Sequence, residues 1–565
     1  MNAIDKLKEY GVSLIITVDN GIVAIDEVKY AKSLGIDMVI TDHHQPREEL
    51  PQAVAVVDPH RKDCPSEFKS LAGVGVAFKL VMALDEDEGD FNTLLENYSD
   101  LVAIGTIGDI VPIKNENRFF VKNGMKYISH TDRVGLKALL EEAGIYGKSF
   151  STGSVSFTIV PRINACGRMS SSDKAVQLLL SDYKDISDEI AASIGDENRF
   201  RQKAEQEIVK EVEELFKREP HRIYEQILVV EGENWHQGVI GIVASKITEK
   251  YGKPSIVISS SNGLSKGSGR SIEGFSLYDA VYACSEHLTM FGGHPMAAGL
   301  NLYSKDVEAF KASIENYAKN YGEIPAAKLK IDCKLNPKAL SIDLINQISE
   351  LEPFGFSNPK PMFVLSNMSL EKIQPVGGGK HLRLRFTRND TAVTAMKFSI
   401  TKEDFPYTVG DILDLAVSID MNEYNGEKSL SIIIRDYKLS ISDYESIIEF
   451  KRDFEKIKRG DINLKNSISL FIPSRNEFAE IYRYLRHNSG FKGTIDILQY
   501  RIGDTQINFG KMAVILDIMN ECGLINLLID GDDYAVNLKD VTGKVDLESS
   551  SLLKRLKSWR GEKHA

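Results

Sequence analysis

Two acidic residues stand directly after short apolar runs near the start of the chain. Asp19 follows LIITV at residues 14–18, and Asp42 follows DMVIT at residues 37–41. Each run is typical of a buried strand, and residues 24–34 between them have a helical pattern. A single strand–helix–strand crossover in a parallel sheet would bring both side chains to one carboxyl edge, where such sheets bind ligands.

Imidazole groups extend this acidic edge. His43 and His44 follow Asp42, and Asp109 closes an apolar helical stretch that includes residues 100–108. Carboxylates with imidazole suit Mn²⁺ or Mg²⁺ better than a zinc–thiolate site, and the five scattered cysteines contain no CxxC pair. Two such ions, roughly 3.5–4 Å apart in known sites, activate water and stabilise the leaving oxygen of a phosphodiester.

Each of these residues also has an ordinary structural interpretation. Asp19-Asn20-Gly21 is a common turn sequence, and Asp42 could cap a helix. One histidine could simply be buried and hydrogen-bonded. The joint placement of these side chains at strand ends is what favours a metal site.

A second set of residues is suited to binding phosphate. Residues 265–271, after a strand at 255–259, are rich in glycine and serine, and we expect a loop that contains Ser268 and Arg270. Backbone N–H groups at glycines and an arginine fork both bind anions. His294, in GGHP, precedes a segment at 296–299 where we expect a helix N-terminus, which also favours phosphate. Tight turns are the alternative interpretation of both segments.

The motifs around the first set resemble those of the DHH phosphoesterase superfamily, and within it the RecJ family of single-strand-specific exonucleases. TVDNG, TDHHQP and AIGTIGDIVP are similar to three of the superfamily's four sequential motifs. The resemblance implies that Asp19, His43 and Asp109 are metal ligands for Mn²⁺ or Mg²⁺. It implies that Asp42 is a further ligand or a catalytic carboxylate beside them, and that His44 hydrogen-bonds the scissile phosphate.

The resemblance continues in the second set. WHQGVIGIVAS at residues 235–245, GSGR and GGHP match the DHHA1 domain in its RecJ form. This implies that Ser268 and Arg270 hold a terminal 5′ phosphate and that His294 lies near the nucleotide backbone. PRINACGR at residues 161–168 resembles a family segment that adds Arg168 to this pocket. Such a pocket would explain 5′→3′ polarity, and a channel too narrow for a duplex would explain single-strand specificity.

Short strands and turns dominate from residue 328 onward. We expect strands at residues 328–333, 362–365, 381–387, 392–398, 412–419 and 429–437. This pattern suggests a small β-barrel of OB type, which the RecJ resemblance also implies after EPFGFSNP at 352–359. Arg383 and Arg385 alternate along one strand and so share a face that could bind a single strand; an ordinary solvated face is the alternative.

These patterns predict an α/β chain of five parts. We expect a doubly wound parallel-sheet DHH domain at residues 1–185, a long connector helix at 186–220 and an α/β DHHA1 domain at 221–325. An OB-fold-like domain at 326–442 and a mixed α/β, winged-helix-like domain at 443–565 would follow. The chain has no apolar run of about 20 residues and no signal-peptide pattern, and the odd, scattered cysteines favour a cytoplasmic protein.

Two features qualify the expected activity. The net charge of −12 leaves nucleic acid undecided, because binding depends on where cations gather. The superfamily opens with a strand carrying an Asp-x-Asp-Gly motif, which supplies two more aspartates and does not precede Asp19 here, so we expect an N-terminally truncated form.

The function we expect is therefore a 5′→3′ exonuclease for 5′-phosphorylated single-stranded DNA in recombination and repair. A helicase and a single-strand-binding protein are the expected partners. The first alternative is a truncated, catalytically impaired protein that binds single strands without cutting them. The second is a phosphodiesterase of short oligonucleotides, which the β-rich region after Lys328 disfavours.

Overall fold

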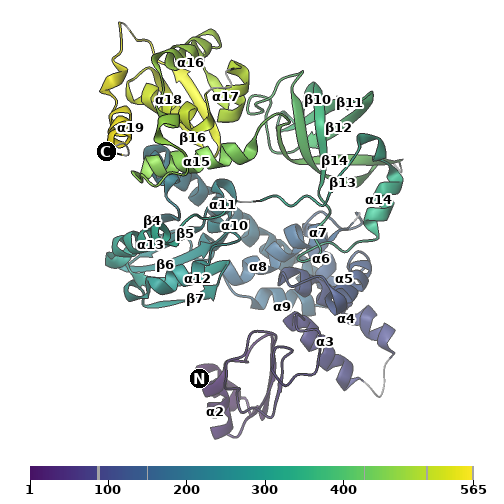
Figure 1. The fold of residues 1–565 in the computed structure, drawn as a ribbon. Coiled ribbons are helices and arrows are strands. Elements are labelled where there is room, and N and C mark those ends of the chain that lie inside the picture. Colours follow the sequence, from purple (N-terminus) through teal and green to yellow (C-terminus); the bar gives the residue numbers. More distant parts are fainter. Residues whose placement is uncertain are drawn as a thin grey trace. The chain divides into compact units, whose positions relative to one another are not determined.

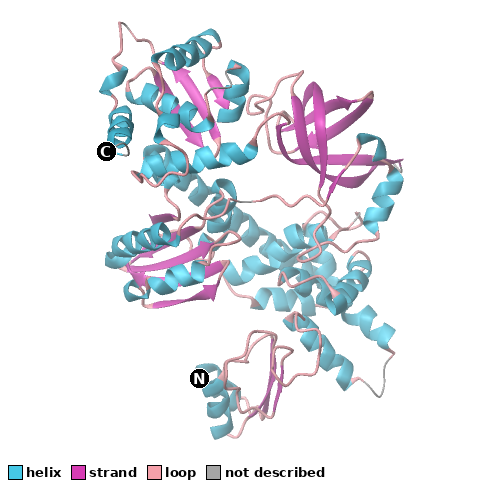
Figure 2. Cartoon of the chain, viewed as in Figure 1, coloured by secondary structure: helices cyan, strands magenta, loops and turns pink. Residues whose placement is uncertain are grey.

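The computed structural model describes residues 1–85, 90–148, 150–326, 328–424, 427–503, 507–541 and 543–562 (Figures 1 and 2). The chain divides into two compact units. The first comprises Met1–Gln202 with Asn346–Lys360, and the second comprises Lys203–Ile345 with Pro361–Ala565. Within the described ranges, no helix combines the length and the apolar character that crossing a membrane requires.

A three-stranded parallel sheet opens the first unit. Its strands are β1 (Leu14–Val18), β2 (Asp37–Thr41) and β3 (Ala55–Val57), in the order β1-β2-β3. The crossover between β1 and β2 is α2 (Ile25–Ser33), which with α1 (Asn2–Glu9) covers a small apolar core around Ile36 and Ile40. The predicted parallel sheet is confirmed, and the register pairs Val18 with Thr41, so Asp19 and Asp42 leave the sheet side by side.

The outer side of this sheet is open. Among the described strands β1 pairs only with β2, and its side chains Leu14, Ile16 and Val18 are 48%, 48% and 56% exposed. β1 is therefore an edge strand with an apolar, accessible face.

Helices make up the rest of the first unit. They are α3 (Gly73–Leu84), α4 (Phe91–Gly108), α5 (Asn115–Ile128), α6 (Val134–Glu142) and α9 (Asp173–Leu180), with one further helix of three parts, α7 (Thr152–Ser154), η1 (Val155–Ile159) and α8 (Val160–Met169). They enclose a core that includes Ile104, Leu139 and Ile159. After α14 (Ile342–Ser349), the chain returns to this unit, where the Ile113 N–H donates to the Phe356 carbonyl at 2.8 Å.

The long helix α10 (Lys184–Arg218) runs from the first unit into the second, as the predicted connector helix requires (Figure 1). Its buried stripe includes Ile208, Val212 and Phe216, while most of its charged residues face solvent. A 3₁₀ turn, Pro220–Tyr224, follows it.

The second unit begins with a five-stranded mixed sheet in the order β4-β5-β6-β8-β7. Its strands are β4 (Leu228–Glu233), β5 (Ser255–Ser261), β6 (Leu264–Arg270), β7 (Met290–His294) and β8 (Ala297–Tyr303). Only β4 and β5 pair in parallel; the other neighbours are antiparallel. The helices are α11 (Ile240–Tyr251), α12 (Leu277–Ala283) and α13 (Val307–Tyr321).

Two expectations for this sheet were wrong. The stretch expected as a loop at residues 265–271 is almost entirely strand β6, because its glycines serve packing: a Cβ on Gly267 would lie 2.7 Å from Leu300. The segment expected to open a helix at residues 296–299 instead starts β8, where Ala298, Leu300 and Leu302 alternate toward the core.

A closed barrel follows, which confirms the expected OB type. Its strands are β10 (Phe363–Val376), β11 (His381–Arg388), β12 (Thr391–Lys397), β13 (Ile412–Tyr424) and β14 (Glu427–Leu439). The order is β11-β12-β14-β13-β10, and β10 also pairs with β11, which closes the barrel. The strand expected at 328–333 is reduced to β9 (Cys333–Lys334); the side chains of Leu329 and Ile331 are exposed instead of packing into the barrel.

The last region has the element order of a winged helix. After α15 (Tyr444–Arg459) come α16 (Arg475–His487), β15 (Phe491–Gly493), α17 (Ile495–Ile502), α18 (Phe509–Glu521), β16 (Ile525–Asp530), β17 (Asp533–Leu538) and α19 (Ser551–Glu562). The sheet order is β15-β17-β16. In α18, the five consecutive residues 512–516 are all buried, so no side of the middle of this helix is free to enter a DNA groove.

The environment of Glu225, after the Pro220–Tyr224 turn, makes stability depend on pH. Burial raises its pKa from 4.5 to about 7, although Arg222 opposes the shift. The folded chain therefore holds this proton more tightly than the unfolded chain, and the resulting stabilisation is complete below pH 4.5 and is lost as the pH rises to 7.

We expect Glu225→Gln to raise the thermal unfolding midpoint by a few degrees at pH 8, and to change it far less at pH 5. Circular dichroism melts at both pH values would measure this, with Glu214→Gln on the exposed side of α10 as the control. An equal shift at both pH values would contradict a raised pKa.

Candidate functional site

Asp19 leaves β1 in an unusual backbone conformation. Its φ is +58°, in the left-handed region that non-glycine residues seldom adopt. The turn is closed by the Thr17 hydroxyl, which donates to the Asn20 carbonyl at 2.6 Å. Residues in this region occur often at functional sites, which is consistent with a role for Asp19 beyond a plain turn.

Asp42 organises the neighbouring strand end. Its carboxylate is buried and accepts backbone N–H groups from Ile22 at 2.9 Å, His43 at 2.7 Å and His44 at 3.2 Å. It also accepts the ring Nδ1–H of His44 at 2.7 Å. Burial alone would raise the pKa of Asp42, but these four hydrogen bonds hold it below its usual value, so the group is a fixed anion.

His43 has the geometry of a metal ligand. Its Nδ1 lies 3.0 Å from the Leu71 carbonyl, which can only accept, so Nδ1 donates to this carbonyl and the ring is oriented with Nε2 toward the sheet edge. Nε2 lies 3.0 Å from Asp19 Oδ1 and 3.4 Å from Asp109 Oδ2, yet it is buried and makes no hydrogen bond within the described chain. One ring nitrogen and two carboxylates that converge in this way could act together as ligands of a cation.

These side chains form a compact donor set. Ligand atoms of Asp19, His43 and His44 lie within 4.8 Å of one another, and Asp109, directly after the last residue of α4, adds a further carboxylate. Burial raises the pKa of Asp109, as does the Asp19 charge. Oxygen donors with one or two imidazoles fit Mn²⁺ or Mg²⁺, so Asp19, His43 and Asp109 are suited to hold such an ion.

His44 is held differently from His43. Its side chain is 61% exposed, and only its Nδ1 is fixed, by Asp42. The hydrogen bond to Asp42 raises the pKa of His44, and the charges of Asp19 and Asp109 add to this, although burial opposes it. A protonated imidazole at this position is suited to donate a hydrogen bond to a phosphate oxygen.

Two residues near the sheet edge are not among those that the sequence patterns predicted. Asp58 follows β3 and is 3% exposed; burial raises its pKa, and the neighbouring Asp42 charge adds to the effect. Its position directly after the third strand was a usable signal. Gly73, in the first turn of α3, admits the Asp19 carboxylate, because a Cβ at this position would overlap Asp19 Oδ1. Glycine is required at residue 73 because of a contact with Asp19, 54 positions earlier in the chain, and no local sequence pattern reveals such a contact.

The predicted phosphate residues of β6 meet the first turn of α11. Arg270 Nη1 lies 3.4 Å from Ser268 Oγ, and a Cβ on Gly241 would lie 2.9 Å from Ser268 Oγ and 3.3 Å from Arg270 Nη2. A hydroxyl, a guanidinium and the N-terminus of a 12-residue helix therefore converge at one point. Each of these groups favours an anion, so together they are suited to a phosphate.

His294 lies on the same side of this sheet. Arg270 pairs with Ala297, which pairs in turn with His294, so the three residues form one row across β6, β8 and β7. In the next row, Ser268 lies opposite Gly299, and Gly299 opposite Gly292. A Cβ on either of these glycines would meet nothing within 4 Å, which leaves open backbone beside Ser268.

Arg168 lies close to a second arginine. Arg168 is exposed as a whole residue, but partial burial of its charged group and the charge of Arg201 both lower its pKa. Arg201 is itself buried. The Asn198 side-chain oxygen accepts from Arg201 at 3.1–3.2 Å, which orients that guanidinium. Two neighbouring guanidiniums favour an anion between them.

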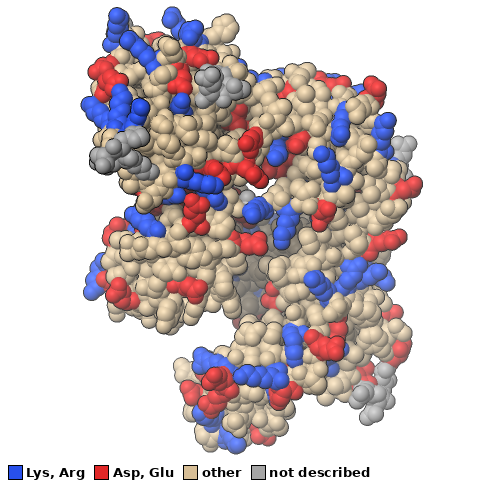
Figure 3. Space-filling view, in the orientation of Figure 1, with Lys and Arg blue, Asp and Glu red and all other residues tan. Residues whose placement is uncertain are grey.

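The barrel presents a basic strand face. Arg383 and Arg385 are exposed on β11, and Lys372 of β10 lies directly opposite Arg385. Glu371 accepts from Arg385 at 3.1 Å, so part of this charge is balanced. Figure 3 shows Lys and Arg side chains over the barrel and elsewhere, interspersed with acidic residues, so the net negative charge does not form one continuous acidic surface in this view.

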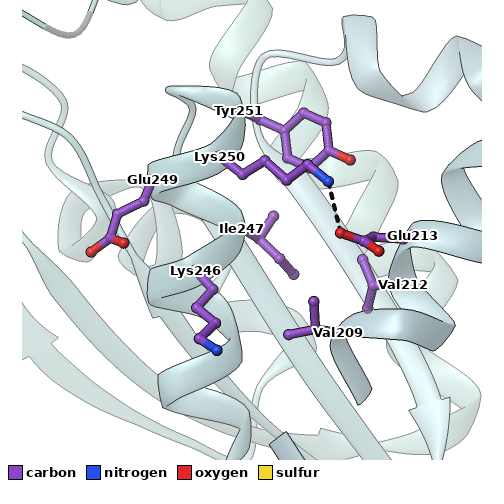
Figure 4. Close-up of a pocket in the computed structure, with 8 residues that line it drawn as sticks. All are labelled: Val209, Val212, Glu213, Lys246, Ile247, Glu249, Lys250 and Tyr251. Atoms are coloured by element: carbon purple, nitrogen blue, oxygen red, sulfur yellow. Dashed lines mark hydrogen bonds and ion pairs between the residues drawn. The ribbon is translucent and has the colours of Figure 1, made fainter. Parts of the chain in front are cut away.

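A hollow between α10 and α11 contains none of the predicted site residues (Figure 4). It is lined by Val209, Val212, Glu213, Lys246, Ile247, Glu249, Lys250 and Tyr251. Lys250 donates to Glu213 at 2.7 Å and is paired with Asp530 at 2.7 Å. Although burial opposes the shift, these two contacts raise the pKa of Lys250 to about 12. Its charge is thus already neutralised, and the hollow is a packing feature of the two helices.

Family models match three parts of the chain. The DHH family N-terminal domain matches residues 2–106, the DHHA1 domain matches 224–320, and the RecJ OB domain matches 331–436. These ranges contain most of the residues described above: the sheet-edge cluster up to α4, the β6–α11 cluster and the basic strand face.

Curated relatives and a solved structure cover most of the chain. The single-stranded-DNA-specific exonuclease RecJ of Bacillus subtilis (strain 168) is 37% identical over 445 residues, 78% of this chain and 55% of the relative. The protein of the same name from Escherichia coli (strain K12) is 33% identical over 462 residues, 76% of this chain and 78% of the relative.

The crystal structure of RecJ in complex with Mn²⁺ from Thermus thermophilus matches with a TM-score of 0.67 at 29% identity. The match covers 77% of this chain and 63% of that one. The chain thus spans little more than half the length of the Bacillus subtilis relative.

The contact between Gly73 and Asp19 predicts a metal-binding defect. We expect Gly73→Ala to displace the Asp19 carboxylate and weaken Mn²⁺ binding by about 10- to 100-fold, the usual effect of disturbing a group that supports a ligand. Isothermal titration with Mn²⁺ alone would measure this. Gly561→Ala, where a Cβ meets nothing within 4 Å, is the control, and equal affinity of the two variants would contradict the role of Gly73.

Proposed function

Because the chain belongs to the RecJ family, we propose that it is a divalent-metal-dependent exonuclease that hydrolyses single-stranded DNA from the 5′ end, in recombination and repair. The observation that carries the proposal is the position of His43 Nε2, which faces the carboxylates of Asp19 and Asp109 at 3.0 and 3.4 Å. The names of the relatives, single-stranded-DNA-specific exonucleases, supply the substrate class.

Each residue of the edge has a distinct task in this proposal. Asp19, His43 and Asp109 hold Mn²⁺ or Mg²⁺, the ions present in two crystal structures of RecJ from Thermus thermophilus. When bound, such ions lower the pKa of a coordinated water and stabilise negative charge on the leaving oxygen. Asp42 keeps both histidines in place through three hydrogen bonds, and His44 donates to an oxygen of the scissile phosphate.

Recognition of the 5′ end rests on the β6–α11 cluster. Ser268 and Arg270, with the first turn of α11, bind the terminal phosphate, and the open glycine rows toward His294 let the nucleotide backbone approach the sheet. Arg168, beside Arg201, binds a further phosphate. A terminal phosphate has one more negative charge than an internal one, which favours the end of a strand over its interior.

The barrel contributes affinity along the strand. Lys372, Arg383 and Arg385 form a cationic face that suits a sugar–phosphate backbone without base recognition. We expect a helicase to supply single strands and a single-strand-binding protein to hold them, because the proposed substrate must first be separated from a duplex.

Strand binding without cleavage is the second candidate. It is favoured by the openness of the edge, since the side chains of Asp19 and Asp109 are 55% and 40% exposed. An ion in such a site keeps more water ligands and is bound less tightly than in an enclosed one.

One assay separates the two candidates. The full chain with Mn²⁺ should release mononucleotides from a 5′-phosphorylated single strand labelled at its 3′ end, and His43→Ala should abolish this. Fluorescence anisotropy in EDTA measures binding in parallel. Binding without turnover at any Mn²⁺ concentration would leave only the second candidate, and the absence of both would overturn the proposed function.

Arg270 should determine the preference for a 5′ phosphate. We expect Arg270→Ala to reduce the ratio of affinities for 5′-phosphorylated and 5′-hydroxyl strands by about 10- to 100-fold, because a charge-assisted hydrogen bond is lost. Lys305→Ala removes an exposed cation from the same sheet region and is the matched control. An unchanged ratio in Arg270→Ala would exclude this residue from the pocket.

A further inference from the structure

One helix of the first unit carries a large aromatic side chain in solvent. Residues 152–169 form a continuous helix, in which the π-helical segment η1 (Val155–Ile159) joins α7 to α8. Phe157 lies in this segment and is 84% exposed, whereas Val155 and Ile159 are completely buried. π-Helical turns are rare and occur often at functional sites. An exposed phenylalanine on such a turn is therefore a candidate functional residue.

Phe157 shares a helix face with groups that suit nucleic acid. Pro161, Asn164 and Arg168 follow it at intervals of four, three and four residues, which places all four side chains on one side. Asn164 and Arg168 are exposed, while Ala165 and Cys166 point into the core. At about 1.5 Å per residue, this face extends over roughly 15 Å, the length of two to three nucleotides of an extended strand.

The same helix packs against the end of α4 that carries Asp109. A Cβ on Gly108 would lie 3.3 Å from Val160 Cγ2, and Asp109 is the next residue of the chain. Val160 is three residues after Phe157, less than one helical turn away. The exposed ring therefore lies only a few residues from a packing contact with the helix end that bears Asp109. We call the edge formed by Asp19, Asp42, His43 and Asp109 the metal edge.

We propose that Phe157 is a stacking platform for a base of the single strand, and that the face from Phe157 to Arg168 guides the strand past the metal edge. This inference rests on the proposed function and adds a subsite to it. The ring binds the base by its flat surface, Asn164 hydrogen-bonds the sugar or base edge, and Arg168 binds phosphate. Stacking accepts every base, which suits an enzyme that degrades strands of any sequence.

The size of the effect follows from the stacking surface. Removing one aromatic platform lowers single-strand affinity by about 5- to 150-fold, and another aromatic side chain retains it. We therefore expect Phe157→Leu to weaken binding of a short oligodeoxythymidine within this range, and Phe157→Tyr to restore it. Anisotropy in EDTA measures binding without cleavage, and circular dichroism verifies that each variant is folded.

An abasic oligonucleotide distinguishes stacking from a general effect on the fold. Strands in which every sugar lacks its base keep their phosphates but have nothing to stack, so wild type and Phe157→Leu should bind them equally. A loss of the same size on abasic strands would overturn the stacking role, as would equal binding of normal strands by both proteins.

A tryptophan probe reports the contact directly. We expect the fluorescence of Phe157→Trp to be quenched when a single strand binds, beyond the change seen with the native Trp235 and Trp559. Leu180→Trp, at a position 74% exposed on α9, is the control and should show no added quenching. Binding without quenching at residue 157 would overturn the subsite and leave the proposed function intact. A wild-type chain that binds no single strand would overturn both.

Discussion

The buried carboxylate of Asp42 is the group on which the geometry of the metal edge depends. It is nearly inaccessible to solvent, so it can persist as an anion only because three backbone N–H groups and the His44 ring satisfy it. Those same bonds set the direction of the chain after β2 and thereby place both histidines. The stabilisation of one buried charge and the positioning of the candidate ligands are thus the same set of interactions.

A second constraint is that a helix backbone must come close to the functional side chains, and a glycine makes this possible at the sheet edge and at the β6–α11 cluster. Gly73 leaves room for the Asp19 carboxylate at the start of α3, and Gly241 leaves room for Ser268 and Arg270 at the start of α11. In both places a helix N-terminus faces polar or charged groups, with no side chain between them. The sheet edge of the first unit and the β6–α11 cluster of the second unit therefore share one feature, a helix N-terminus whose dipole favours negative charge.

Electrostatics in this protein is local. The net charge of −12 coexists with an arginine pair at Arg168 and Arg201, with Arg270 beside Ser268 on β6, and with a cationic strand face on the barrel. The carboxylates at the sheet edge add to the negative total and are also what would attract a divalent cation. A cation bound there would reduce their repulsion of a DNA backbone, so acidic ligands and an anionic substrate are compatible at one edge.

The sequence by itself determined the elements whose signal is local. The β-branched runs predicted the bounds of β1 and β2 to the residue. The spacing of Asp19 and Asp42 on either side of α2 predicted that they share a sheet edge. Both signals are local, because strand and helix periodicities depend on neighbouring residues. The family motifs added the roles expected for His43, His44 and Asp109.

Only the tertiary structure decided what depends on contacts between distant segments. It made a strand of the glycine-rich stretch at 265–271, whose small residues accommodate Leu300 and Ile258 instead of forming a loop. It also brought Gly73 to Asp19, Gly241 to Ser268, and the turn that bears Phe157 to the end of α4. Each of these depends on which atoms occupy the space beside a residue, and that space is created by packing between elements far apart in the chain.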